Sequence, residues 1–298
     1  MAEKFEYEKT LKTPADNQFL NLQSFLFVTS KQLTAIFFRA GVHPHQVILL
    51  SMLFGLAASL LIIQQNFSAV LVGAVLLFYK NVLDKVDGSL ARAKGVDSRR
   101  GRFYDSISDF IVTFASFTAI AYSLYMQYQS VWIIAAVYAA MISSMLQCSY
   151  FIFYQVSFIK LTGKNTVNRL IESVTDEDIH RQDSFTTLLQ RVFQLIYGWQ
   201  DKLFFEINRV IFARFSNTNT GKVHTSEKID AAWYGNKSFL TVASSLSIGT
   251  HIFLICLAAL IRRFDYYIFV NLICMNLLLL LSVIFHYKSS KKQLISAV

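Results

Sequence analysis

Long apolar runs, separated by short polar segments, dominate the pattern of the chain. Six runs stand out, at residues 47–63, 67–91, 103–125, 131–159, 239–261 and 266–287. An α-helix needs about 20 predominantly apolar residues to cross the hydrocarbon core of a bilayer, and each run comes close to that length. The pattern therefore predicts an all-α integral membrane protein built as a six-transmembrane-helix bundle.

Two further stretches mix apolar residues with charges and are poor candidates for spanning helices. In residues 17–40, Lys31 and Arg39 interrupt the apolar positions, which predicts an N-terminal amphipathic helix lying in the membrane interface. In residues 161–236, apolar residues recur at roughly helical spacing from Phe185 to Phe215, between basic residues. This region is expected to form one or two amphipathic helices that lie on the membrane or on the rest of the protein.

The pattern divides the chain into four parts. They are an N-terminal cytosolic segment with the interfacial helix (1–45), transmembrane helices 1–4 (46–160), a helical cytosolic insertion between helices 4 and 5 (161–236), and transmembrane helices 5 and 6 with a basic tail (237–298). Basic residues collect on the cytoplasmic side of membrane proteins. The basic segment at 92–102 and the basic tail therefore predict a multi-pass protein with both termini in the cytoplasm.

Composition agrees with a membrane protein and narrows the classes of partner. The 298 residues are 54% hydrophobic and 16% charged, with a mean hydropathy of +0.42. The net charge of +9 suits contact with anionic membrane lipid, and the basic residues are not gathered on a soluble domain as nucleic-acid binding requires. The three cysteines lie inside apolar runs without metal-ligand spacing, so we expect neither a disulfide framework nor a cysteine metal site.

The strongest chemical signal is a set of four aspartates where the second and third runs approach each other. Asp84 and Asp87 are three residues apart, and Asp105 and Asp109 are four apart, so on helices each pair projects from one face. Two antiparallel helices would bring the four carboxylates together at the membrane edge. Such carboxylates repel one another unless cations neutralise them, which predicts one or two bound divalent metal ions. Any one of these aspartates alone is more often a solvated residue at a helix end.

The stretch also resembles the signature of the CDP-alcohol phosphotransferase family, which reads Asp-x-x-Asp-Gly-x-x-Ala-Arg, eight residues, then Gly-x-x-x-Asp-x-x-x-Asp. Its fixed positions are filled by Asp84, Asp87, Gly88, Ala91, Arg92, Gly101, Asp105 and Asp109. The motif spans only 26 residues, but its eight fixed positions make it specific. The chain departs from the usual family pattern before the first run, where many members have Asn in place of His45 and Thr in place of Ile48.

The resemblance implies a reaction, cofactors and a set of site residues. Family members catalyse attack by an alcohol hydroxyl on the phosphorus of a CDP-alcohol, with release of CMP. The implied ligands of two Mg²⁺ or Mn²⁺ ions are Asp84, Asp87, Asp105 and Asp109, with Asp109 also the general base. The implied nucleotide contacts are Asp84, Gly88, Ala91, Arg92 and Gly101. The active site is expected on the cytoplasmic side, and a homodimer is a candidate assembly because dimers are common in the family.

The two substrates are open at this point. Six-span family members of this size mostly use CDP-diacylglycerol and a small polar alcohol in phospholipid biosynthesis. Members with phosphorylated acceptors often carry an Arg/Lys pair after a Ser-Tyr, whereas here Ser149-Tyr150 is followed by no base until Lys160, which favours an uncharged or zwitterionic acceptor. The alternative is CDP-choline or CDP-ethanolamine with diacylglycerol as acceptor. Candidates for acceptor selection are Lys164, Asn165 and Arg169.

Two other classes of protein compete with the enzyme interpretation. A divalent-cation transporter also places acids within spanning helices, but it does not need Gly88 and Ala91 or a basic segment between the acid pairs. A catalytically inactive scaffold is disfavoured because none of the four aspartates is replaced.

Overall fold

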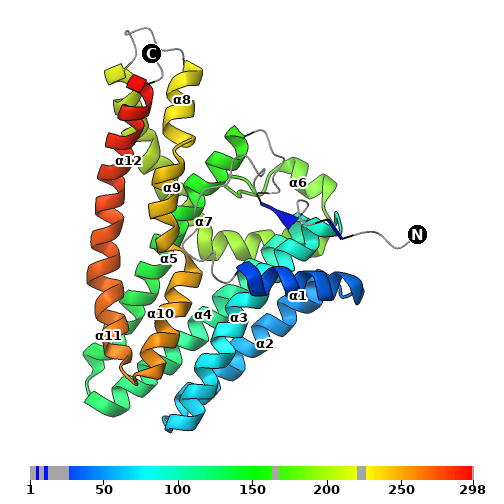
Figure 1. Ribbon diagram of the computed structural model, residues 1–298, viewed down its shortest axis with the longest axis vertical. Helices are drawn as coiled ribbons and strands as arrows, with labels where there is room; N and C mark the ends of the chain where they lie inside the picture. The colour runs from blue at the N-terminus through cyan, green and yellow to red at the C-terminus, as the bar shows by residue number, and fades with distance from the viewer. Residues whose placement is uncertain (1–4, 7–9, 13–26, 163–167, 220–225, 297–298) are drawn as a thin grey trace. The chain divides into compact units, whose positions relative to one another are not determined.

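The computed structural model describes residues 5–6, 10–12, 27–162, 168–219 and 226–296, and every regular element within them is a helix (Figure 1). In chain order these are α1 (Phe27–Arg39), α2 (Pro44–Ile63), α3 (Phe67–Ala93), α4 (Arg99–Tyr128), α5 (Val131–Leu161), α6 (Asp176–Arg181), α7 (Ser184–Asn219), α8 (Ser226–Tyr234), α9 (Lys237–Ala243), a 3₁₀ turn (Ser244–Leu246), α10 (Ile248–Leu260), α11 (Phe264–Phe269), a π-helical segment (Val270–Met275) and α12 (Asn276–Ser296). The predicted all-α class is confirmed for the described residues.

These helices form two compact units. The first unit contains α1 to α4, the N-terminal half of α5, α10, α11 and the π-helical segment. The second contains the C-terminal half of α5, α6 to α9 and α12. All four aspartates of the motif belong to the first unit, so the candidate site is built from that unit alone.

The connection between α3 and α4 is shorter than the basic loop expected at 92–102. Gly95, with φ of +63°, turns the chain just after the end of α3. Ser98 then caps α4, because its side chain accepts a hydrogen bond from the Gly101 backbone N–H at 3.1 Å. Helix therefore continues to Ala93 and resumes at Arg99. The short connection makes α3 and α4 run antiparallel, and both pack against α2.

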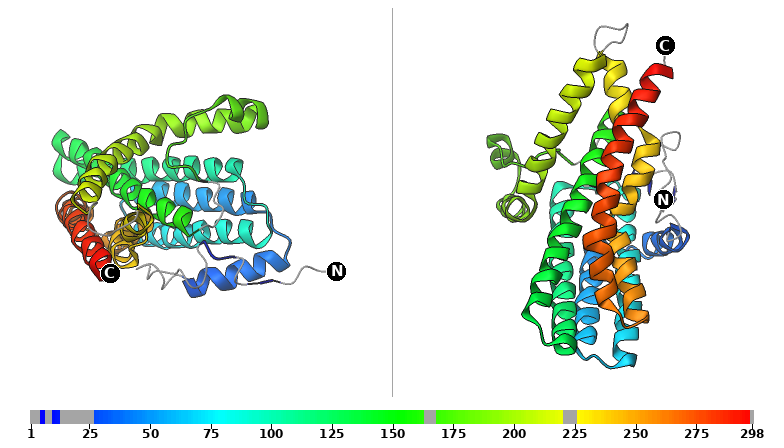
Figure 2. Two further views of the ribbon diagram at one scale, coloured as in Figure 1. Left: turned by 90° about the horizontal axis from the view of Figure 1, so that it is seen from above. Right: turned by 90° about the vertical axis from the view of Figure 1, so that its left-hand side faces the viewer.

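Small residues let α2 pack closely on α3 and α4 (Figure 2). A Cβ atom on Gly55 of α2 would lie 2.3 Å from Cγ1 of Val112 on α4. A Cβ atom on Gly73 of α3 would lie 3.0 Å from the carbonyl oxygen of Ala58 on α2. The first distance is too short for a Cβ atom, so glycine is needed at Gly55. The second is tighter than an ordinary contact, so a side chain at Gly73 would require the helices to shift by a few tenths of an ångström. This packing sets the spacing of the helices that carry the aspartates.

Five helical stretches are long and apolar enough to cross a membrane. They are Pro44–Ile63, Phe67–Ala93, Arg99–Tyr128, Val131–Leu161 and Phe264–Ile295. The sixth expected span, at 239–261, is not one continuous helix. It is divided into α9, the 3₁₀ turn and α10, and meets the same test only when Ser226–Leu246 and Ile248–Leu260 are joined as one broken span. The six-span count is therefore not confirmed.

A cluster of serines accounts for this break. The hydroxyls of Ser244, Ser245 and Ser247 each donate to the carbonyl oxygen three residues earlier, at 2.7, 2.6 and 2.7 Å. Serine hydroxyls that bond to nearby carbonyls compete with the regular helical ladder and bend or end helices. Hydropathy alone does not register this competition, which is why the apolar run looked continuous.

The second unit has a buried aromatic centre. The His286 ring stacks on Phe239 at a centroid distance of 3.9 Å and lies 4.0 Å from the ring of Trp233. The indole N–H of Trp233 donates to Asn208 Oδ1 of α7 at 3.0 Å, which fixes α7 against α8. This packing explains why the predicted amphipathic stretch at 185–215 forms one helix instead of two.

The opposite face of α7 is apolar and exposed. Its exposed large side chains are Phe185, Leu188, Leu195, Trp199, Leu203, Ile207 and Val210. The expected helix at 17–40 corresponds to α1, and residues 17–26 of that prediction lie outside the described part of the chain. Contact of α1 and α7 with the membrane surface stays a prediction.

We expect Gly55→Ala to destabilise the protein by about 1–3 kcal/mol, because the added methyl group overpacks the contact with Val112. Thermal unfolding of the purified protein in detergent measures the effect. The double variant Gly55→Ala/Val112→Ala provides the control, since it removes the methyl groups of Val112 that the added methyl group would meet. A single variant as stable as the wild type, or no recovery in the double variant, would contradict the close packing of α2 on α4.

Candidate metal centre

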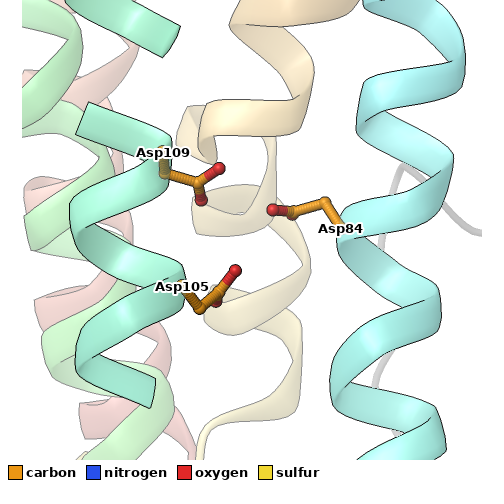
Figure 3. Close-up of side chains that lie close together, drawn as sticks. All are labelled: Asp84, Asp105 and Asp109. Carbon is orange, nitrogen blue, oxygen red and sulfur yellow. The ribbon is translucent and has the colours of Figure 1, made fainter. Parts of the chain in front are cut away.

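Three of the four predicted metal ligands face one another between α3 and α4. Asp84 extends from α3 toward Asp105 and Asp109, which lie one turn apart on α4 (Figure 3). One carboxylate oxygen from each of the three lies within 4.8 Å of the others, and all three residues are partly buried. The structure thus brings together one member of the first acid pair and both members of the second.

Asp87 lies outside that group of three. It follows Asp84 by one turn on α3 and is 4% exposed. Its Oδ2 atom is buried and has no hydrogen-bond partner. A buried carboxylate oxygen without a partner is costly, and a bound cation is one group that removes this cost.

The donor set fits a hard divalent cation. The cluster offers only carboxylate oxygens, which Mg²⁺ and Mn²⁺ prefer over nitrogen and sulfur. Ligands on opposite sides of Mg²⁺ lie about 4.2 Å apart, since each Mg–O distance is about 2.1 Å. The three oxygens lie within 4.8 Å of one another, so they are close enough together to serve as ligands of one ion. The buried Oδ2 of Asp87 is a further acceptor on the same helix as Asp84.

Sequence analysis missed Lys80, which the structure joins to this cluster. Lys80 on α3 is 2% exposed, and its ammonium group pairs with Asp84 Oδ1 at 3.3 Å and also with Asp109 Oδ1. A signal was available, because Lys80 stands alone inside an apolar run, four residues before Asp84 and therefore on the same helix face. The apolar run was interpreted as a span, and the single charge within it was passed over.

The two glycines of the motif have no structural need to be glycine. A Cβ atom on Gly88 would come no closer than 3.3 Å to Arg92 Nη1, and one on Gly101 no closer than 3.4 Å to Ser98 Oγ. Neither has a positive φ. In contrast with Gly55, each position would admit a Cβ atom, but that atom would already contact neighbouring side chains. Glycine leaves the helix backbone bare at these two positions, which suits close approach of a ligand.

Arg92 is partly engaged by the chain itself. Its Nε donates to the Thr10 carbonyl oxygen at 2.8 Å, and its Nη2 approaches Ser89 Oγ at 3.4 Å. Its Nη1 is the atom that a Cβ atom at Gly88 would contact first. Arg92 therefore ties the N-terminal segment to α3 and also presents a cationic edge beside the bare backbone at Gly88.

The acceptor candidates are only partly described. Lys164 and Asn165 lie outside the described residues. The guanidinium of Arg169, in the second unit, donates to both carboxylate oxygens of Asp178 at 2.8 Å, and this pairing raises the pKa of Arg169. Burial would raise the pKa of Asp178, but hydrogen bonds from Arg169, Gln190 and Thr175 outweigh it and hold that pKa below its usual range. The guanidinium of Arg169 is therefore held by Asp178 within the second unit.

The comparison with protein families agrees with the motif. The sequence profile of the CDP-alcohol phosphatidyltransferase family matches residues 42–171, a range that includes α2 to α5 and all four aspartates. No curated protein matches the chain.

We expect Asp105→Asn to weaken binding of Mn²⁺ to the purified protein by about tenfold or more, because the variant removes a charged ligand from the carboxylate group. Electron paramagnetic resonance of free Mn²⁺ measures the bound fraction directly. Asp97→Asn is the matched control, since Asp97 lies in the α3–α4 connection and outside the cluster. Equal Mn²⁺ binding by the wild type and Asp105→Asn would contradict a metal centre at these carboxylates.

Proposed function

We propose that this chain, whose residues 42–171 are a CDP-alcohol phosphatidyltransferase domain, transfers a phosphatidyl group from CDP-diacylglycerol to a small polar alcohol and releases CMP. The observation that carries the proposal is the group of three facing carboxylates, Asp84, Asp105 and Asp109, inside the matched region. An acidic cluster of this kind suits a reaction on a pyrophosphate, whose negative charge has to be neutralised before a nucleophile can approach.

The proposed metal ligands are the four aspartates of the motif, with Asp87 joining the group of three through its buried oxygen. When bound, two Mg²⁺ or Mn²⁺ ions would neutralise the pyrophosphate and stabilise the entering and leaving oxygens of the displacement. The chain itself fixes the positions of the carboxylates, because α3 and α4, which carry them, are both packed against α2. This positioning reduces the reorganisation needed when the substrates react.

In this mechanism Asp109 accepts the proton of the acceptor hydroxyl as general base. The hydroxyl oxygen then forms a bond to the phosphorus of the phosphatidyl group, the bond from that phosphorus to the CMP oxygen breaks, and CMP leaves with the bonding electron pair. Asp109 suits this role because it lies one turn further along α4 than Asp105, on the same side of the helix. General bases of this type contribute about 10²- to 10⁴-fold to rates.

The nucleotide is proposed to lie along the small residues of the motif. Gly88, Ala91 and Gly101 are small, which suits approach of a cytidine diphosphate to the helix backbones. Arg92 would contribute its Nη1 edge to a diphosphate oxygen. The basic residues at the start of α4 favour a cytoplasmic position for this end of the site.

The choice of an uncharged or zwitterionic acceptor rests on the Ser149-Tyr150 segment. Ser149 donates to Gln200 at 2.7 Å, and Tyr150 packs against Phe204 at a ring distance of 5.8 Å. Both side chains are buried inside the second unit. A segment built into a core in this way does not offer a cationic site for a phosphorylated acceptor.

The direct test measures CMP release by the purified protein with CDP-diacylglycerol and a panel of labelled alcohols, with and without Mg²⁺. We expect release that depends on both the metal and an uncharged or zwitterionic alcohol. A second panel offers CDP-choline or CDP-ethanolamine with diacylglycerol, and activity only there would reverse the assignment of the substrates. Absence of CMP release in both panels, with Mg²⁺ flux into vesicles instead, would identify a cation transporter.

We expect Asp109→Asn to lower turnover by about 100-fold or more while the protein stays folded, because an amide cannot accept the proton of the alcohol. The rate of CMP release reports the loss, and thermal unfolding in detergent reports the fold. Asp97→Asn again provides a charge-matched control that should keep full turnover. Wild-type turnover in Asp109→Asn would refute both the general-base role and the assignment of Asp109 as a metal ligand.

A further inference from the structure

Lys80 is a buried cation at the centre of an acidic cluster. Its side chain is 2% exposed and contacts carboxylates on two helices, Asp84 on α3 and Asp109 on α4. A lysine within a membrane-spanning helix usually extends its ammonium group toward the interface, where water solvates the charge. Lys80 instead keeps its ammonium group inside the bundle, so the two carboxylates supply the stabilisation that water would otherwise give.

Other basic side chains near this end of α3 have different partners. Lys94 donates to the Val42 carbonyl oxygen at 2.8 Å, and the Nε of Arg92 donates to the Thr10 carbonyl oxygen. Both therefore hold neighbouring segments of chain. Lys80 is distinguished from them by salt bridges to two of the clustered carboxylates, one on each of the helices that form the site.

The charges near Lys80 leave a clear imbalance. Lys80 compensates one negative charge, and Lys85 and Arg92 interact electrostatically with Asp84 and Asp87, respectively. The three facing carboxylates and Asp87 supply up to four negative charges. At an effective dielectric constant near 20, unit charges about 4 Å apart interact by several RT, so both the attraction to Lys80 and the repulsion among the acids are large. A single lysine reduces the repulsion between α3 and α4 but leaves charge for metal ions to neutralise.

We propose that Lys80 is a built-in counter-ion that stands in for metal while the site is empty, a role that rests on the metal centre of the proposed function. In the metal-free protein Lys80 holds Asp84 and Asp109 toward each other and links α3 to α4 across the site, while both helices pack on α2. When metal enters, Lys80 shares these carboxylates with it, so the lysine stabilises the metal-free form more than the loaded form. Lys80 is thus a positioning residue that also opposes metal binding.

The test compares unfolding temperatures of the full-length protein in detergent, first in EDTA and then in Mg²⁺. Lys80→Met keeps the length and the apolar stem of the side chain but removes its charge. We expect it to lower the unfolding temperature in EDTA by about 5 °C or more, and to show a larger rise on addition of Mg²⁺ than the wild type. In EDTA, the double variant Lys80→Met/Asp109→Asn should regain part of the lost stability, because it removes a negative charge together with the positive one.

Lys94→Met is the matched control, since it removes one charge from the end of the same helix but leaves the salt bridges of Lys80 intact. Lys94→Met should show the same rise in unfolding temperature on addition of Mg²⁺ as the wild type. The proposal would be overturned if Lys80→Met lowered the unfolding temperature by the same amount in EDTA and in Mg²⁺. It would also be overturned if, in EDTA, the double variant were no more stable than Lys80→Met.

The outcomes separate failure of this proposal from failure of the metal assignment. If Mg²⁺ does not stabilise the wild type, the metal assignment fails, and the single and double variants in EDTA still decide whether Lys80 acts as a counter-ion. If Lys80→Met does not fold but the double variant does, the uncompensated acids prevent folding and the proposal is supported. If neither folds, Lys80 has a structural role beyond its charge and the proposal is overturned.

Discussion

Repulsion among carboxylates held inside an apolar bundle is the constraint on which the rest of the structure depends. Three carboxylate oxygens within 4.8 Å of one another would push α3 and α4 apart unless the surrounding packing resists. Each such pair of charges costs about 3–4 kcal/mol at an effective dielectric constant near 20. The close contact of Gly55 with Val112 and the buried core of α2, α3, α4 and α10 provide that resistance. A site of this kind has to be carried by well-packed helices, because loops would relax until the charges separated.

The same constraint explains why small residues occur in two distinct settings. Gly55 is needed by the protein, because a Cβ atom there would overlap Val112 of another helix, and a methyl group at Gly73 would press on the carbonyl oxygen of Ala58. At Gly88 and Gly101 a Cβ atom would meet only side-chain atoms, at 3.3 Å or more. The first pair lets the helices come close together, and the second pair leaves the helix backbone bare near the acids. Tight helix packing and bare backbone therefore occur at different positions along these helices.

Much of the first unit could be predicted from local pattern. The spans at 47–63, 67–91 and 131–159 match α2, α3 and α5 to within a few residues, because each is apolar throughout and ended by polar caps such as Asn66. The clustering of Asp84 with Asp105 and Asp109 also followed from helical spacing, since a short connection leaves antiparallel packing as the simplest arrangement. These features depend on residues that are close in sequence or are joined by one turn.

Two features could not be predicted from hydropathy, namely the break in the sixth expected span and the contacts of Lys80. The break at Ser244–Leu246 comes from hydroxyl groups that bond to backbone carbonyls, although the segment around it is apolar. The role of Lys80 depends on Asp109, which lies 29 residues later on another helix. A lone lysine in an apolar run carries a large cost unless an acid from a different segment reaches it, so its presence is itself a sign of a distant partner. In this chain the buried lysine and the acidic cluster explain each other: the acids make it possible to bury Lys80, and Lys80 offsets part of the repulsion among the acids.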